Sequence, residues 1–278
     1  MSKGKLRLIK RRIDSTVSTK KITKAMQMVA SARLNKAQKN LKSIKEYAYY
    51  AEKLISKITP DQENILVKGG KGTVIVVIST DMGLAGAFPT EIGSTALKLS
   101  QQYNDFVGFI AVGNRAELEL KKTGKILFSR TNLYDIPSKE NAEYILDDIL
   151  DLLENNKAYN FEIVYGELKN ALIQRPKTEK LLPIQIDSKE NARYEYEPDN
   201  AELFDEASYL FLLSKIYSFM YETKLSELHA RQNAMKNATE NAQNLIEDLK
   251  LDYNKLRQAS ITTELIEIVN GAQALQQE

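Results

Sequence analysis

Two long stretches without a helix-breaking residue constrain this sequence more than any other feature. All six prolines and ten of the twelve glycines lie between Pro60 and Pro198. On either side, apolar residues recur at three- and four-residue spacing over residues 5–59 and in heptads over residues 199–270, which is typical of amphipathic helices. At about 1.5 Å per residue, these helices would be roughly 80 Å and 105 Å long, far beyond the diameter of a domain that this chain could build.

The two predicted helices need partners for their apolar stripes. A single projecting helix would leave its stripe in water, so we expect the two ends of the chain to wind around each other as a long antiparallel coiled coil. The predicted organisation is an N-terminal helix at residues 1–59, a middle domain at 60–198 and a C-terminal helix at 199–278.

The middle of the chain alternates between strand and helix patterns. Residues 73–80, TVIVVIST, form a β-branched run of the kind that a buried parallel strand shows. Further strands are predicted at 106–112, 161–168 and 181–186, and helices after Pro89, at 116–122 and at 140–156. The fold class is therefore α/β, a Rossmann-like domain with a mixed or parallel sheet covered by helices, joined to the long antiparallel coiled coil.

Charge is distributed unevenly between the N-terminal segment and the remainder. Residues 1–45 contain fourteen Lys and Arg and one acid, Asp14, which gives this segment a charge of +13 although the whole chain carries +2. This charge predicts an acidic binding partner, which is either a protein surface or nucleic acid. A solvated basic face without a partner is the remaining alternative.

Catalytic and cofactor motifs are missing from the predicted α/β domain. The chain has no cysteine and one histidine, His229, which argues against thiol chemistry and against a histidine metal site. The turn at residues 81–86 follows a predicted strand, where a doubly wound sheet would bind a ligand, but it has neither GxGxxG nor GxxxxGK[ST]. We therefore expect no catalytic residue, no metal and no cofactor, and the acidic residues of 140–154 are interpreted as a solvated helix face.

Both ends of the chain resemble the gamma subunit of F-type ATP synthases. The first matching segment is RRIDSTVSTKKITKAMQMVASARLNKAQ, residues 11–38, and the second runs from SELHARQNAMKNATENAQ to ITTELIEIVNGAQAL, residues 226–275. The middle of the chain resembles the family only in its α/β pattern and in fragments. Segments of this length are specific, so the resemblance identifies the chain as a member of that family.

The resemblance implies a non-catalytic rotor subunit with large protein partners. In that family the coiled coil enters a hexamer of three alpha and three beta ATPase subunits, and rotation couples proton flow through a membrane ring of c subunits to ATP synthesis or hydrolysis. The α/β domain meets the epsilon subunit and the ring. No nucleic acid or small-molecule substrate is implied, and the expected location is peripheral, on the cytoplasmic face of the cell membrane.

The resemblance also implies contact residues. Those expected to face the hexamer are Ala25, Met26, Arg231, Arg257, Gln258 and Thr262. The end of the C-terminal helix would turn in an apolar bearing, with Ile266, Val269 and Leu275 at its tip. The segment YEYEPD resembles the part of the family that meets the ring or epsilon, which implies contacts for Tyr196, Glu197 and Asp199.

One segment departs from the family pattern. Residues 79–89 read STDMGLAGAFP, where the family usually has a word like SDRGLCGGFN. The change lies in the middle domain and leaves the two helices untouched. It keeps open a specialised rotary ATPase that drives another process, and a nucleic-acid-binding or adaptor coiled coil remains the alternative from a different class.

Overall fold

The computed structural model describes residues 2–58, 63–185 and 200–276. The chain divides into two compact units. One unit combines the N-terminal residues 1–29 with residues 232–278, and the other comprises residues 30–231. The predicted division into three segments has its boundaries after residues 59 and 198. Both boundaries adjoin residues outside the described ranges, and the three-segment division therefore stays a prediction.

The two long helices predicted from the missing helix breakers are present. Helix α1 spans Ser2–Ile55 and helix α6 spans Asn200–Gln276, with 54 and 77 residues. At about 1.5 Å per residue they are roughly 80 Å and 115 Å long. Among the described helices, none has an apolar stretch long enough to cross a membrane.

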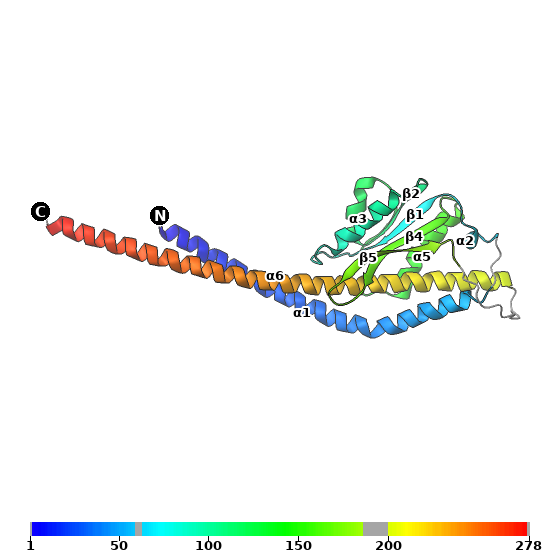
Figure 1. Cartoon of the computed structure of the whole chain (residues 1–278), viewed down its shortest axis with the longest axis horizontal. Helices are drawn as coiled ribbons and strands as arrows, with labels where there is room; N and C mark the ends of the chain where they lie inside the picture. The colour runs from blue at the N-terminus through cyan, green and yellow to red at the C-terminus, as the bar shows by residue number, and fades with distance from the viewer. Residues whose placement is uncertain (1, 59–62, 186–199, 277–278) are drawn as a thin grey trace. The chain divides into compact units, whose positions relative to one another are not determined.

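Within residues 30–231, α1 and α6 lie side by side and run in opposite directions (Figure 1). Their facing apolar residues form a buried seam of Leu34, Ala37, Ile44, Tyr221, Leu225 and Leu228. Three polar pairs flank the seam at intervals of seven residues on both helices, namely Gln38 with His229, Lys45 with Glu222, and Glu52 with Lys215. Seven-residue spacing on both partners is the repeat of a coiled coil, which confirms the predicted antiparallel pairing.

A five-stranded mixed sheet forms the centre of the same unit. Its strands are β1 (Thr73–Ile78), β2 (Phe106–Val112), β3 (Ile126–Arg130), β4 (Asn160–Leu168) and β5 (Gln174–Leu182). The order is β3-β2-β1-β4-β5, and only β5 runs antiparallel to its neighbour. The β-branched run of β1 is buried along its whole length because β1 is central and both faces are covered.

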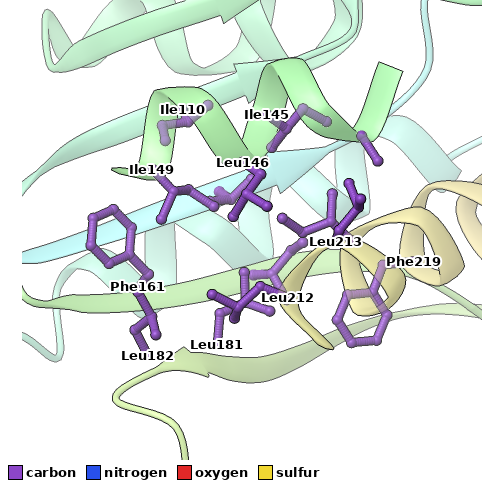
Figure 2. Close-up of a cluster of buried hydrophobic side chains, with 14 of the residues drawn as sticks. Ile110, Ile145, Leu146, Ile149, Phe161, Leu181, Leu182, Leu212, Leu213 and Phe219 are labelled. Carbon is purple, nitrogen blue, oxygen red and sulfur yellow. The ribbon is translucent and has the colours of Figure 1, made fainter. Parts of the chain in front are cut away.

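Helices cover both faces of the sheet. The helices are α2 (Ile65–Lys68), α3 (Phe88–Ser100), α4 (Asn114–Leu120) with a 3-10 turn at Lys121–Thr123, and α5 (Lys139–Glu154). Helices α3 and α4 bury their apolar residues against one face. Helix α5 and the first part of α6 pack on the other, and Figure 2 shows Ile145 and Leu146 of α5 close to Leu212 and Leu213 of α6.

Two details of the sheet differ from the sequence prediction. The last strand was predicted at residues 181–186, but β5 ends at Leu182. Most of β5 lies before residue 181 and contains Pro176. An edge strand tolerates a proline because one side of its backbone makes no hydrogen bonds to a neighbouring strand. Strand β3 was not predicted. It is also an edge strand, and its residues alternate between half-buried and exposed, so it has no continuous apolar run.

Candidate functional site

The unit formed by residues 1–29 and 232–278 is a pair of helical segments whose facing sides are partly polar. The ammonium group of Lys20 donates a hydrogen bond to the Gln243 side-chain oxygen at 2.6 Å, and the hydroxyls of Thr239 and Thr23 are 2.9 Å apart. Buried apolar contacts in this unit come from Met235, Ala242 and Ile246. The pair therefore has a thin core and keeps most of its surface open to a partner.

Five of the six residues expected to face a hexamer lie in this unit. Ala25, Arg257, Gln258 and Thr262 are exposed, and Met26 is half-buried. The Thr262 hydroxyl donates to the backbone oxygen of Gln258 at 3.0 Å. These residues are therefore accessible in the free chain, and their contact with a hexamer stays a prediction.

The C-terminal end of α6 exposes several large apolar side chains, with polar residues such as Glu267 between them. Ile266 is 54% exposed and Val269 is 53% exposed, and the side chain of Leu275 lies outside the described part of the chain. Other exposed apolar residues of this stretch are Ile261, Leu265 and Ile268. A soluble surface rarely keeps such a patch uncovered unless it binds a partner.

The sixth residue, Arg231, is positioned differently, in the unit of residues 30–231, where it is buried. Its guanidinium lies 2.6 Å from the Glu227 carboxylate and donates hydrogen bonds to the backbone oxygens of Met82 and Gly83 at 3.1–3.2 Å. Glu227 also pairs with Lys224 at 3.2 Å. A contact of Arg231 with a hexamer stays a prediction, and within the chain it holds the turn after β1.

Sequence reasoning missed the partners of Arg231. Lys224 and Arg231 occupy heptad positions that normally hold apolar residues, and this was the one available signal that the seam meets something polar there. Nothing local indicated Glu227 or the Met82–Gly83 turn. The residues expected to meet a ring or epsilon, Tyr196, Glu197 and Asp199, lie outside the described residues, so their roles stay predictions.

The carboxyl ends of the strands, where a doubly wound sheet would bind a nucleotide, are occupied by the chain itself. A carboxylate oxygen of Asp81 accepts hydrogen bonds from the backbone N–H groups of Asn114 and Asn132 at 2.9 and 2.8 Å. These N–H groups follow β2 and β3, where a doubly wound sheet offers backbone donors to phosphate. Across the described ranges, no group of three or more His, Asp or Glu side chains is arranged to hold a metal ion.

The single histidine lies at the interface of α1 and α6. His229 is 6% exposed, and its Nε2 is 3.4 Å from Nε2 of Gln38. Burial lowers the pKa of His229 from its usual value of 6.5, because the charged imidazolium loses hydration there. His229 is therefore neutral in the folded chain at neutral pH.

This environment predicts a pH dependence of stability. Below pH 6.5 the unfolded chain protonates His229 before the folded chain does, so stability is complete above pH 6.5 and is lost as the pH falls toward the lowered folded pKa. The loss is at most about 1.4 kcal/mol per pH unit. We measure the difference in urea midpoint, wild type minus His229→Gln. We expect this difference to be lower at about pH 5.5 than at about pH 7.5. An unchanged difference between the two proteins would contradict this account of His229.

Comparison with known proteins agrees with this architecture. The family model described as ATP synthase matches residues 5–275. An ATP synthase gamma chain from Christiangramia forsetii is 37% identical, with 97% of this chain and 98% of the relative covered. A gamma chain from Erythrobacter litoralis is 35% identical, with 97% and 99% covered.

Solved structures share the fold at lower sequence identity. A chain of the Euglena gracilis mitochondrial ATP synthase, determined with OSCP, F1 and c-ring, has a TM-score of 0.76 at 21% identity, with 98% of this chain and 95% of that chain covered. A Tetrahymena thermophila central stalk and c-ring structure has a chain with a TM-score of 0.60. With a family match over nearly the whole sequence and relatives above 30% identity, the chain belongs to the gamma-chain family of the ATP synthases.

Proposed function

We propose that this chain is the central rotating shaft of an F-type ATP synthase and carries torque between a catalytic hexamer and a membrane rotor ring. The observation that carries the proposal is the group of exposed apolar side chains at the far end of a 77-residue helix, together with gamma chains as relatives. A helix end of this kind needs an apolar bearing outside its own chain. A hexamer with a central cavity supplies one.

The proposed partners are three alpha and three beta ATPase subunits, an epsilon subunit and a ring of c subunits. Residues 1–45 carry a charge of +13, so the shaft would be attracted to acidic loops of the hexamer. In this proposal Ala25, Met26, Arg231, Arg257, Gln258 and Thr262 contact the hexamer. Exposed charged and amide groups can exchange partners as the shaft turns.

Two further contact regions belong to the proposal. Ile266, Val269 and Leu275 form the tip that turns in the bearing. Tyr196, Glu197 and Asp199 meet the ring or epsilon. The chain would then be peripheral at the cytoplasmic face of the cell membrane. The basic N-terminal segment finds its acidic partner in the hexamer, which replaces the alternative of a nucleic-acid-binding rod.

The proposed subunit has no active site of its own, because ATP synthesis and hydrolysis belong to the hexamer. Asp81 occupies the backbone donors that a phosphate would need. We therefore expect titration calorimetry of the isolated chain with Mg-ATP to give no binding heat. Saturable heat with an affinity in the micromolar range would contradict this part of the proposal.

Co-purification from the native cells tests the partners. A tagged chain should bring down three copies each of two large ATPase subunits, an epsilon subunit and the membrane ring. A hexamer without a proton-conducting ring would instead identify a specialised rotary ATPase, which the altered segment at residues 79–89 favours. Absence of a hexamer would refute the shaft proposal.

A further inference from the structure

The order of strands defines a crevice at one edge of the sheet. Strand β1 is followed by α3 and pairs with β2 on one side, and on its other side it pairs with β4, which is reached through α5. Because α3 and α5 cover opposite faces, the carboxyl ends of β1 and β4 flank the switch point. In doubly wound sheets this crevice is the ligand site.

Helix α6 crosses this crevice. Its buried apolar residues from Phe204 to Met220 belong to the core that includes α5 on one face of the sheet. One of its later residues, Ala230, belongs to the core formed with α3 on the opposite face. Residues 221–231 are buried at every position, so this stretch of helix is enclosed on all sides.

Side chains of α6 bind the end of β4 directly. The last residue of β4 that pairs with β1 is Val164. Two residues later, the N–H of Gly166 donates to the Thr223 hydroxyl at 3.0 Å, and its backbone oxygen accepts from the Ser226 hydroxyl at 3.0 Å. Thr223 is 1% exposed and Ser226 is 0% exposed.

The absence of a side chain at Gly166 permits this close approach. A Cβ at that position would overlap the ring of Phe88, the first residue of α3, and would lie 3.4 Å from Cβ of Ser226. The end of β4 is therefore packed between α3 and α6. Any larger residue would have to displace the ring of Phe88.

The end of β1 is held by the same helix. Arg231 donates to the backbone oxygens of Met82 and Gly83, in the turn that follows β1, while Glu227 balances its charge. Both strand ends of the crevice are thus bonded to one stretch of α6. The two bonds to Gly166 are buried, where an unpaired group would cost the full desolvation penalty, and those from Arg231 are part-buried.

We propose that this crevice is a socket in which α6 transmits torque, and that Thr223 and Ser226 are positioning residues that keep the α/β domain turning with the shaft. The inference rests on the proposed rotary function. Without the hydrogen bonds of Thr223 and Ser226 to Gly166, the α/β domain, which meets the ring, could slip relative to α6, which turns in the hexamer. ATP hydrolysis would then continue while proton pumping fell.

The test uses the complete complex in inverted membrane vesicles. In the double variant Thr223→Val and Ser226→Ala, loss of two buried hydrogen bonds lowers the ratio of complexes whose α/β domain is held on α6 to those in which it has slipped, roughly tenfold or more. We expect protons pumped per ATP hydrolysed to fall about threefold or more, with hydrolysis per complex within about twofold of wild type. Thr223→Ser alone keeps its hydroxyl and should keep the wild-type ratio.

Ser214→Ala is the matched control. Ser214 is a fully buried serine of the same helix, but its hydroxyl bonds back to Phe211 of its own helix. This variant should leave the pumping ratio unchanged. An unchanged ratio in the double variant as well would overturn the inference while the rotary function stands, whereas a wild-type chain that assembles with no hexamer would refute the rotary function itself.

Hydrogen exchange of the isolated full chain provides a second measurement that needs no assembly. The amide of Gly166 should exchange at least about tenfold faster in the double variant than in the wild type, because its acceptor is removed. Ser214→Ala should leave this rate unchanged. Equal exchange rates of the Gly166 amide in the double variant and the wild type would contradict the role proposed for Thr223 and Ser226.

Discussion

Replacing Glu227 with alanine is expected to produce the largest loss of stability of any single charge removal in the unit of residues 30–231. Glu227 is 4% exposed and pairs with Arg231 at 2.6 Å and with Lys224 at 3.2 Å. Both cations are also buried. Removing the carboxylate leaves buried Arg231 without its counter-ion and leaves buried Lys224 only its 4.0 Å ion pair with Asp135, which costs about 3–5 kcal/mol.

Urea unfolding of the isolated chain measures this effect. The chain has fourteen tyrosines and no tryptophan, so tyrosine fluorescence reports on unfolding. The midpoint of Glu227→Ala should lie roughly 1–2 M below the wild type. Glu206→Ala, an exposed position of the same helix and unit, should change stability by less than about 0.5 kcal/mol. Equal midpoints for the two variants would contradict the role given to Glu227.

Reversing the charge of Arg257 is expected to produce the largest loss of coupled turnover without unfolding the chain. Its side chain is exposed in the free chain, so Arg257→Glu removes no internal contact of a buried group. In the proposed assembly, where Arg257 contacts the hexamer, the same change would turn an attraction into a repulsion. Disrupting a buried interfacial charge costs about 2–5 kcal/mol, so turnover should fall at least about tenfold.

The measurement is ATP hydrolysis and ATP-driven proton pumping per purified complex. Lys98→Glu provides the matched control, since it makes the same charge change at an exposed position of α3. That variant should retain turnover within about twofold of the wild type. Hydrolysis and pumping unaffected by Arg257→Glu would remove Arg257 from the proposed contacts.

Local sequence patterns predicted the elements but not the contacts between them. The long helices follow from stretches without Gly or Pro, and β1 follows from its β-branched run, because both signals act within a few residues. Strand β3 was missed because an edge strand alternates and is short. The bond from Gly166 to Thr223 spans 57 residues, and no periodicity in the sequence encodes such a pairing.

Arg231 has partners within the chain that its motif did not indicate. Its match to the family segment predicted a polar contact with the hexamer, and that contact stays a prediction. The structure buries its guanidinium against Glu227 and two backbone oxygens. A sequence position gives the residue type, but the direction of a side chain on a helix with buried residues all around depends on its tertiary neighbours.

Rotation of single complexes would show whether this chain turns inside the hexamer. The chain has no cysteine, so Lys98→Cys creates a unique attachment site for a bead on α3. With the hexamer fixed to a surface, added ATP should turn the bead continuously in one direction, at a rate that follows ATP hydrolysis. A bead that stays still, or only fluctuates, on complexes that hydrolyse ATP would contradict the account of this chain as a rotating shaft.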